Sequence, residues 1–330
     1  LNRNNLSWDE IMDNPDTKEI NFESLPFNHP LYIMYSSGTT GKPKSIVHSA
    51  GGTLIQHLKE LSLHTNITRD DTVFYFTTCG WMMWNWLVSS LSIGATIVLY
   101  DGNPCYPEPD SLLKMADDLD FTVFGTSAKY ITILNASGVK PKSISSFNKL
   151  KSILSTGSTL SGENFDYIYS NFKNIQLSSI SGGTDIISCF ALGNPILPVY
   201  RGELQCKGLG MDVDSYDANG TPVKNLKGEL VCKTAFPSMP IYFWNDDDGL
   251  KYHSAYFNNF NDIWSHGDYI EINDHNGIVI YGRSDATLNP GGVRIGTAEI
   301  YNVLEKRADI DDSLVIGKMI DNDEKIILFV

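Results

Sequence analysis

The sequence predicts an α/β fold, with a mixed, largely parallel sheet followed by an antiparallel β region and the start of a small α+β domain. Between residues 31 and 180, apolar runs alternate with segments whose apolar residues recur at helical spacing, as in strands joined by helices. After about residue 186, short apolar runs are separated by Gly, Pro and turns such as Asn219-Gly220, which favours antiparallel strands. The 330 residues suffice for one large domain or two ordinary ones.

The first half of the chain predicts its elements in alternation. Residues 1–29 are polar and rich in turn residues, and residues 31–35 form an apolar run typical of a buried strand. A loop at 36–44 and a short strand at 46–47 follow, and Leu54, Leu58 and Leu61, with Ile55, then recur at helical spacing. Further strands are expected at 72–77, 95–100, 121–124, 153–154 and 175–180, and further helices at 81–92, after the N-cap Asp110, at 127–135 and at 163–172.

The end of the chain predicts a separate small unit. Residues 282–294 are rich in turn residues, and they precede an expected helix at 297–306 and strands at 313–317 and 325–330. The roughly 45 residues after this turn are too few for an independent core.

Composition excludes several classes of protein. With 25 Lys and Arg against 39 Asp and Glu, the net charge of −14 argues against a broad basic face for nucleic acid or anionic lipid. A small anionic ligand stays open, because a local pocket can oppose the global charge. The sequence has no apolar stretch long enough to cross a membrane, so no stable membrane insertion is expected. The 5 cysteines form no Cys-x-x-Cys pair, which makes a disulfide framework or zinc site unexpected and the reducing cytosol the expected compartment.

The loop at residues 36–44, Ser-Ser-Gly-Thr-Thr-Gly-Lys-Pro-Lys, is the strongest local signal. Small residues let the backbone approach a ligand closely, successive N–H groups can form an anion-binding nest, and hydroxyls and lysines suit phosphate oxygens. Pro43 stands where a Walker A loop needs its second glycine, which disfavours a kinase or P-loop ATPase. A flexible surface loop is the simpler alternative, and the strand that leads directly into this segment favours the phosphate-binding interpretation.

This loop resembles the phosphate-binding signature of the adenylate-forming superfamily, which includes acyl-CoA synthetases, luciferases and peptide-synthetase adenylation domains. The resemblance implies that the loop binds the β- and γ-phosphates of ATP, with Lys44 as the lysine that the motif requires and Lys42 at a variable position. The phosphate-binding residues implied are Ser36, Ser37, Gly38, Thr39, Thr40, Gly41 and Lys44.

Two further motifs resemble nucleotide-contacting segments of the same superfamily. Residues 181–185, Ser-Gly-Gly-Thr-Asp, resemble the core motif that ends in Thr-Glu. The resemblance implies that Gly183 and Thr184 contact the nucleotide and that Asp185 binds Mg²⁺, with a shorter reach or a bridging water because Asp replaces Glu. An ordinary Gly-Gly turn is the simpler alternative. Gly157, Ser158 and Thr159 follow a strand and resemble the turn that contacts adenine.

The last two motifs lie near the end of the chain. Residues 264–268 are similar to the aromatic-x-Thr-Gly-Asp motif, which implies that Asp268 binds the ribose hydroxyls; His266 replaces Thr and receives no role. Residues 282–285 and 291–295 look like the hinge motif, with Arg283 at the ribose, Arg294 among the nucleotide-binding residues and Asp285 as the pivot. Asn289 stands where many relatives carry Lys. All five motifs occur in the order of the superfamily.

This order implies the domain organisation. Residues 1–284 would form the later part of a large AMP-binding domain, and residues 285–330 the hinge and the truncated start of a C-terminal domain. Leu1 and Val330 are then expected to be cut ends, with residues 325–330 forming a strand whose sheet partners are missing. The catalytic lysine of the superfamily's C-terminal domain would lie beyond Val330.

A narrower resemblance concerns the acid. Residues 29–33, 77–86, 100–102, 181–186 and 264–270 resemble acyl-CoA synthetases that act on acetoacetate. Relatives that act on acetate close the acyl pocket with a Trp where this chain has Gly182, next to Gly183, so a longer acid is expected to fit. Trp81 is expected to line the substrate pocket, although the helical spacing of Trp81, Trp84 and Val88 is explained more simply by core packing.

The implied reaction joins acetoacetate and coenzyme A at the expense of ATP, with Mg²⁺, through an acyl-adenylate, and releases AMP and pyrophosphate. Two alternatives stay open: a ligase for another short acid, and a truncated nucleotide-binding module without turnover. The chain alone is expected to bind nucleotide weakly and to show negligible ligation. A serine hydrolase and a Rossmann dehydrogenase are disfavoured, because neither Gly-x-Ser-x-Gly nor Gly-x-Gly-x-x-Gly occurs in the required context.

Overall fold

A five-stranded parallel sheet forms one half of the molecule, as the alternating pattern predicted. The computed structural model describes residues 7–13, 21–36, 43–286, 288, 295–304, 307, 309–310, 312–320 and 323–330. The strand order is β4-β3-β5-β6-β7, and every neighbouring pair is parallel. The strands are β3 Thr72–Tyr75, β4 Thr96–Val98, β5 Val123–Ser127, β6 Ser152–Thr156 and β7 Gln176–Ser179, and the helices between them are α3 Met82–Ser89, α4 Ser111–Asp118, α5 Ala128–Ala136 and α6 Gly162–Asn171.

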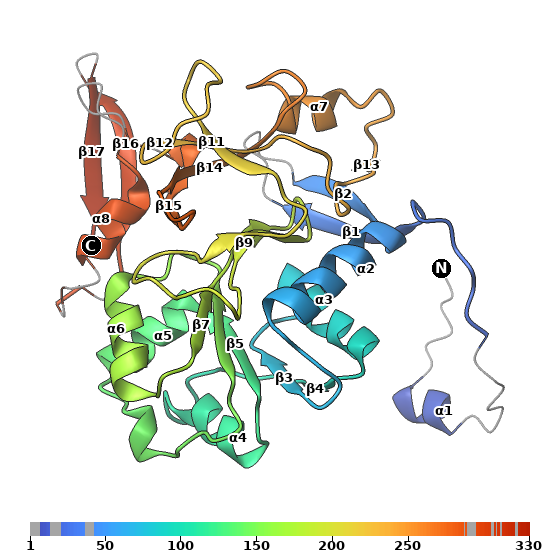
Figure 1. Cartoon of the computed structure of the whole chain (residues 1–330), viewed down its shortest axis with the longest axis vertical. Helices are drawn as coiled ribbons and strands as arrows, with labels where there is room; N and C mark the ends of the chain where they lie inside the picture. The colour runs from blue at the N-terminus through green and yellow to red at the C-terminus, as the bar shows by residue number, and fades with distance from the viewer. Residues whose placement is uncertain are drawn as a thin grey trace.

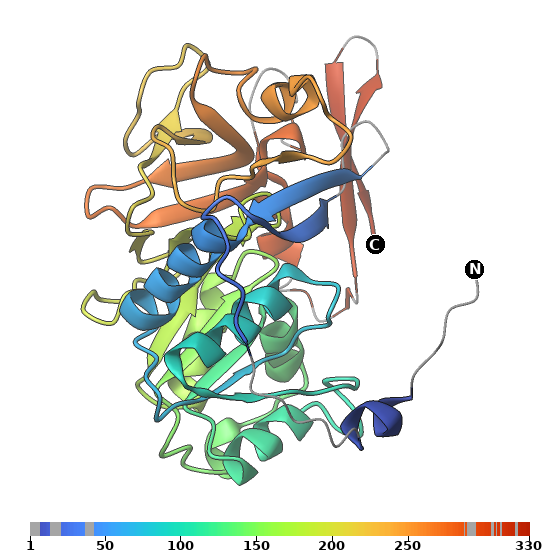
Figure 2. The ribbon, with the colours of Figure 1, turned by 90° about the vertical axis from the view of Figure 1, so that its right-hand side faces the viewer.

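The core of this half lies on the faces of the parallel sheet. Phe74, Phe124, Ile153 and Leu177 are at most 1% exposed, as expected for strands covered on both faces. Phe74 also stacks on Phe121, with ring centroids 4.8 Å apart. In Figures 1 and 2 this sheet and its helices form the lower half of the molecule.

Antiparallel strands form the other half, which confirms the change of pattern after residue 186. The largest sheet here has the order β11-β12-β14-β15, and two three-stranded sheets have the orders β1-β2-β13 and β10-β9-β8. The strands are β1 Pro30–Ser36, β2 Lys44–Ser49, β8 Ser181–Gly183, β9 Ser188–Leu192, β10 Cys206–Lys207, β11 Val213–Tyr216, β12 Lys227–Cys232, β13 Tyr242–Phe243, β14 Trp264–Ile272 and β15 Ile278–Arg283. The first predicted strands therefore pair with each other and with β13 and stand apart from the parallel sheet.

Strand β1 is not buried, contrary to the prediction from its apolar run. Leu31, Ile33 and Tyr35 are 47%, 42% and 67% exposed, while Tyr32 and Met34 pack against a core cluster. The reason is that β1 is an edge strand, and successive side chains of a strand point to opposite faces.

The helix predicted from Leu54, Leu58 and Leu61 exists, but its buried face is largely polar. It comprises α2 Ala50–Lys59 and a π-helical turn, η1 Glu60–His64. Leu54 is 44% exposed, whereas Gln56, His57, Glu60 and His64 are at most 1% exposed. Helix α3 likewise buries Met82, Met83, Trp86 and Leu87, and leaves Trp81, Trp84 and Val88 only half-buried. Of this last stripe, which was expected in the core, Trp81 packs against a core cluster, while Trp84 and Val88 are half-buried.

Several shorter elements differ from the prediction. Asp110 is at the N-cap position of α4, but its carboxylate pairs with Lys114 at 2.8 Å in place of a side-chain cap. The polar N-terminal region contains α1 Trp8–Met12, which starts with a capping box of Ser7 and Glu10. Two further elements were not predicted as such, the 3-10 turn η2 Ser90–Ile93 and the helix α7 Leu250–Tyr256. Short 3-10 turns also occur at η3 Pro141–Ser143 and η4 Ser284–Ala286.

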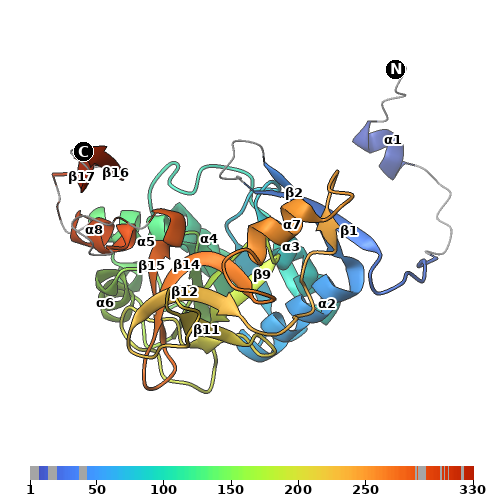
Figure 3. The same cartoon turned by 90° about the horizontal axis from the view of Figure 1, so that it is seen from above.

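The C-terminal segment forms a helix, α8 Thr297–Leu304, and a hairpin of β16 Leu314–Ile320 and β17 Asp323–Phe329. The predicted helix extended through residues 305 and 306, which lie outside the described residues. Strand β17 was expected to lack sheet partners, but it pairs with β16. The antiparallel register runs from Leu314 opposite Phe329 to Ile320 opposite Asp323. Seen from above, this hairpin lies beside α8 at one edge, and α1 lies apart from the body on the other side (Figure 3).

In the described part of the chain, no helix combines the length and apolarity needed to span a membrane.

Candidate active site

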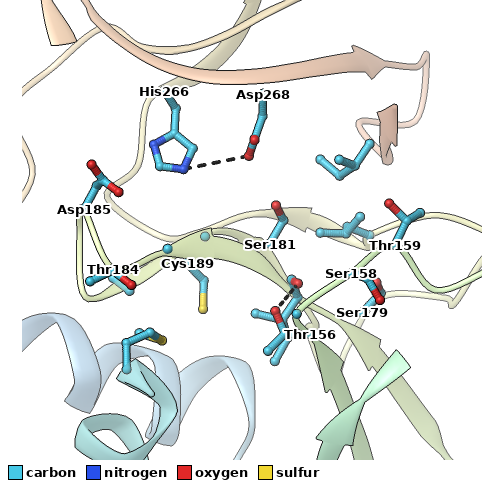
Figure 4. A pocket seen from close by; sticks show the side chains of 18 of the residues that line it. Thr156, Ser158, Thr159, Ser179, Ser181, Thr184, Asp185, Cys189, His266 and Asp268 are labelled. Atoms are coloured by element: carbon cyan, nitrogen blue, oxygen red, sulfur yellow. Dashed lines mark hydrogen bonds and ion pairs between the residues drawn. The ribbon is translucent and has the colours of Figure 1, made fainter. Parts of the chain in front are cut away.

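A cavity of about 380 Å³ lies at the carboxyl ends of β6 and β7, where the two halves of the molecule meet. The carboxyl ends of parallel strands are the usual position of ligand sites in α/β proteins. The cavity brings together residues that the sequence motifs singled out separately. From these motifs its lining contains Gly157, Ser158, Thr159, Gly182, Gly183, Thr184, Asp185, Asp268 and Arg283, and Trp81 also lines it. Figure 4 shows Ser158, Thr159, Thr184, Asp185 and Asp268 around the cavity.

Lys44 and Asp185 form an ion pair at this site, although 141 positions separate them in the sequence. Lys44 begins β2, directly after the predicted phosphate loop, and its Nζ donates to Oδ1 of Asp185 in the turn between β8 and β9. Burial opposes the ionisation of Asp185, but His266, Lys44 and a hydroxyl donor outweigh it, so the pKa of this carboxyl is lowered. Asp185 is thus held as a carboxylate next to the end of the loop.

Tyr256 is a second partner of Asp185 that the sequence analysis missed. Its hydroxyl donates to Oδ1 of Asp185 at 2.5 Å, and its ring stacks on Trp264 with centroids 3.7 Å apart. Burial and the adjacent carboxylate raise the pKa of Tyr256, which keeps the hydroxyl protonated as a donor. The spacing of Tyr252 and Tyr256, four residues apart in α7, was the available signal.

His48 forms a hydrogen bond with the backbone of the turn that carries Thr184. Nε2 of His48 donates to the carbonyl oxygen of Thr184 at 3.0 Å. Burial lowers the pKa of His48 to about 4, so the ring is neutral near pH 7. Backbone bonds from Ile186 to Gly183 and from Ile187 to Thr184 close the same turn. Thr184 therefore lines the cavity on a turn that several hydrogen bonds hold, and its contact with phosphate stays a prediction.

Gly182 and Gly183 have different surroundings, and this corrects the explanation of the acyl pocket. A Cβ at Gly182 would lie 2.0 Å from the backbone oxygen of Ser188, so on this backbone position 182 has no room for any side chain. The glycine there permits the close approach of β8 to β9, and a Cβ at this position would point toward β9. A Cβ at Gly183 would meet only ordinary contacts, 3.5 Å from Nε2 of His266, so the open direction is at Gly183.

Asp268 and Arg283 lie on the adjacent strands β14 and β15 and contact each other. Nη1 of Arg283 donates to Oδ1 of Asp268 at 3.2 Å and to the carbonyl oxygen of His266 at 3.0 Å. The φ of Gly267, between these residues, is 84°, and a Cβ there would lie 2.5 Å from Nη2 of Arg283. The Asp268 carboxylate thus lies at the cavity and accepts from Arg283, and its contact with the ribose stays a prediction.

His266 was given no role from sequence, and it forms one wall of the cavity. Its ring packs edge-on against Phe190 with centroids 4.6 Å apart, and Nε2 lies 3.8 Å from Oδ2 of Asp268. Burial lowers the pKa of His266, and the carboxylates of Asp268 and Asp185 oppose this shift. Figure 4 shows the His266 ring between Asp185 and Asp268.

The turn after β6 faces Trp81. Gly157 has a φ of 93°, and a Cβ at this position would lie 3.5 Å from the Trp81 ring. Trp81 is the N-cap residue of α3, and with Met82, Met83 and Cys189 it gives the cavity an apolar end. Trp81, which was predicted at the substrate pocket, thus lies close to residues 157–159, which were predicted at the nucleotide.

The remaining predicted residues are only partly described. Ser36 ends β1 opposite Lys44, and its buried Oγ has no hydrogen-bond partner in the described part of the chain. Residues Ser37, Gly38, Thr39, Thr40, Gly41 and Arg294 lie outside the described residues, as do Lys42 and Asn289. Asp285, the expected pivot, lies in the turn η4 that follows Arg283.

The fold and this cavity define a nucleotide-binding protein of the adenylate-forming type, and comparison with known proteins identifies the family. Residues 3–243 match the family model described as AMP-binding enzyme, and the chain belongs to this family. The resemblance drawn from the five motifs is thereby confirmed.

The individual relatives are acetoacetyl-CoA synthetases. The chain is 57% identical over 310 residues to acetoacetyl-coenzyme A synthetase of Rhizobium meliloti, covering 94% of this chain and 48% of that protein. It is 54% identical over 314 residues to acetoacetyl-CoA synthetase of Danio rerio, covering 94% and 47%. The chain thus spans about half the length of the curated relatives it matches.

Solved structures agree with this assignment. Acetoacetyl-CoA synthetase from Streptomyces lividans has a TM-score of 0.85 at 46% identity, covering 90% of this chain and 46% of that one. An anthranilate CoA ligase in complex with anthranoyl-AMP has a TM-score of 0.77 at 18% identity, over 92% of this chain and 56% of that one, and it supports the fold alone. The narrower resemblance to enzymes acting on acetoacetate is therefore confirmed as a similarity.

Proposed function

We propose that the chain is part of an ATP-dependent acid–CoA ligase that converts acetoacetate, ATP and coenzyme A into acetoacetyl-CoA, AMP and pyrophosphate. The observation that carries the proposal is the 57% identity to an acetoacetyl-CoA synthetase over 94% of this chain. The convergence of several motif residues on one cavity supports it, because Thr184, Asp185 and Asp268 present polar or charged groups there.

In the first half-reaction, a carboxylate oxygen of acetoacetate attacks the α-phosphorus of ATP, and the bond to the departing pyrophosphate breaks. A carboxylate is already a nucleophile at neutral pH, so positioning and charge neutralisation are the main requirements. Lys44 would neutralise charge on the β- and γ-phosphates, and Thr184 would donate a hydrogen bond to phosphate. Asp268, held by Arg283, would accept from the ribose hydroxyls.

Mg²⁺ fits the donor set around Asp185. Carboxylate oxygens are the ligands that Mg²⁺ prefers, and Oδ1 of Asp185 accepts both Lys44 and Tyr256. Oδ2 has no hydrogen-bond partner among the described residues, and it would hold the ion. When bound, Mg²⁺ supplies neutralisation of phosphate charge.

In the second half-reaction, the thiolate of coenzyme A attacks the acyl carbon of the adenylate, the new C–S bond forms, and AMP leaves. The apolar end at Trp81, Met82, Met83 and Cys189 would hold the acyl group.

We further propose that residues 1–284 belong to the large AMP-binding domain and residues 285–330 to the hinge and a second domain. We place the reaction in the cytosol, which the five free cysteines support.

The test measures AMP and pyrophosphate released from ATP by a protein that carries this chain together with the remaining length found in its relatives. With coenzyme A present, acetoacetate should give a kcat/KM at least tenfold above those for acetate and butyrate. A higher kcat/KM with another acid would transfer the assignment to that acid. No acid-dependent AMP release with any of the three would contradict the proposal.

A further inference from the structure

Glu60 is a fully buried carboxylate that the proposed reaction does not use. It lies in the π-helical turn η1 and is 0% exposed. Oε1 accepts from Nε2 of Gln56 at 3.0 Å, from the backbone N–H of Cys189 at 3.3 Å, and from Oγ of Ser188. Oε2 accepts from Nε1 of Trp86 at 3.0 Å. Nζ of Lys59 lies 4.0 Å from Oε1, so a cation is near this carboxylate without a hydrogen bond to it.

Three of the four donors to Glu60 belong to α3 and β9, which form two walls of the apolar end of the cavity; the fourth, Gln56, is in α2. Trp86 is in α3, one turn after Met82 and Met83, which line the cavity. Ser188 and Cys189 begin β9 and line the cavity themselves. Figure 4 shows the Cys189 side chain pointing away from His266 and Asp268, which lie at the polar end. One carboxylate thus joins α3 to β9 directly behind the region that would hold the acyl group.

The chemistry of these contacts requires a carboxylate. An ionised Glu accepts at both oxygens and presents no donor, so it can accept from all four groups. A Gln at position 60 would place an NH₂ group either against Nε1–H of Trp86 or against the N–H of Cys189. In each orientation one buried donor loses its acceptor, and the two walls are no longer held at the same separation.

We propose that Glu60 is a positioning residue that sets the width of the acyl end of the cavity and therefore the selectivity for the acyl group. This inference rests on the proposed function. Glu60 touches neither the nucleotide-binding residues nor the cavity itself, so its effect on ligands is transmitted through Trp86, Ser188 and Cys189. The nucleotide end is built from β14, β15 and the turn at Asp185, and it keeps its geometry when Glu60 is changed.

The experiment compares the chain with its Glu60→Gln variant by isothermal titration calorimetry. The ligands are AMP and three non-reactive acyl-adenylate mimics, N-acylsulfamoyl adenosines with acetyl, acetoacetyl and hexanoyl groups. In the variant, the affinity ratio of the acetoacetyl mimic over AMP should fall at least about fivefold, the size expected for one lost buried hydrogen bond. The affinity for AMP should change less than twofold. Glu23→Gln, an exposed change of the same chemistry, should alter neither value.

Parallel weakening of AMP and all three mimics would overturn the inference, because it is the signature of a purely structural role. Unchanged ratios in a folded Glu60→Gln variant would overturn it as well. A wild-type chain that binds none of the ligands would contradict the proposed function, and the inference would fail with it. If Glu60→Gln does not fold, Trp86→Phe serves instead, because it removes the Nε1–H donor while retaining an aromatic ring, and the same fall in the ratio is expected.

Discussion

Nζ of Lys44 donates to Oδ1 of Asp185, and this contact joins the end of the predicted phosphate loop to the predicted magnesium ligand. The two side chains are 25% and 15% exposed, so the pair is partly screened by solvent and accessible to a ligand. An incoming triphosphate would compete for Lys44 and leave Asp185 to the metal ion. The pair therefore keeps both groups in place before nucleotide binds.

Replacing Lys44 should discriminate between nucleotides by their phosphates. Lys44→Met removes a cation expected at the β- and γ-phosphates, so the Kd for ATP should rise about tenfold or more, while the Kd for AMP should change less than twofold. Lys42→Met, at a position the motif leaves variable, is the control. Equal weakening of ATP and AMP binding in titration calorimetry would argue against this role of Lys44.

Tyr256 and Tyr252 form a matched pair for testing the support of Asp185. The Tyr256 hydroxyl donates to Asp185 at 2.5 Å, and the Tyr252 hydroxyl donates to the carbonyl oxygen of Pro240 at 3.2 Å. Both changes to Phe should lower the free energy of unfolding by about 1–2 kcal/mol in urea. Only Tyr256→Phe should also weaken Mg²⁺-dependent ATP binding, by several fold. A similar loss of binding in Tyr252→Phe would show that the effect is not specific to Asp185.

Replacement by alanine should lower the free energy of unfolding much more at Gly182 than at Gly183. At Gly182 the added Cβ would meet backbone atoms at 2.0 and 2.6 Å, which cannot move as a flexible side chain would, so stability should fall by about 2 kcal/mol or more. At Gly183 the nearest atom is 3.5 Å away, and the free energy of unfolding should change by less than about 1 kcal/mol. Urea unfolding of the two variants checks this, and equal losses would refute the difference in their surroundings.

Buried histidines should make the fold less stable in mild acid. Nδ1–H of His64 donates to the carbonyl oxygen of Gly193 at 2.8 Å, and Nε2 accepts from the N–H of Leu209 at 3.0 Å, an arrangement that needs the neutral ring. Burial lowers the pKa values of His57 and His64 below the ordinary value of 6.5. Below pH 6.5 the unfolded chain then binds more protons than the folded one, so the free energy of unfolding should decrease as pH falls toward 4.5.

The measurement is urea unfolding at pH 7.5 and pH 4.5, for the chain and for its His64→Gln variant. Gln can donate and accept like the neutral ring but does not titrate in this range. The decrease in the free energy of unfolding between the two pH values should be smaller in the variant. An equal or larger decrease would show that His64 makes no contribution to the pH dependence.

The sequence predicted the strands and helices of the parallel half because their apolar patterns are local. It did not predict which face of α2 is buried. Gln56, His57, Glu60 and His64 are buried because acceptors and donors from β9 and its flanking turns, more than 120 positions away, satisfy them. The hydropathy pattern of a helix assigns polar residues to the exposed face, because it contains no information on such long-range partners.

Some residues of the candidate site were predicted from the sequence, and others were not. Lys44, Thr184, Asp185, Asp268 and Arg283 were predicted because each lies in a motif with a recognisable order. Tyr256 and Glu60 were not, because neither stands in such a motif and their contacts with residues at the site are long-range. The mistaken explanation of Gly182 has a related cause, since the sequence shows that a side chain is absent but not where it would point.

We infer that residues from β2, the turn after β6, the β8–β9 turn, β14 and β15 form one adenylate site. Titration of the chain with acetoacetylsulfamoyl adenosine, before and after Asp268→Ala, tests this most directly. The unchanged chain should bind the mimic at least tenfold more tightly than AMP, and Asp268→Ala should weaken both ligands at least tenfold. Absence of binding, or binding that is indifferent to Asp268→Ala, would contradict the claim.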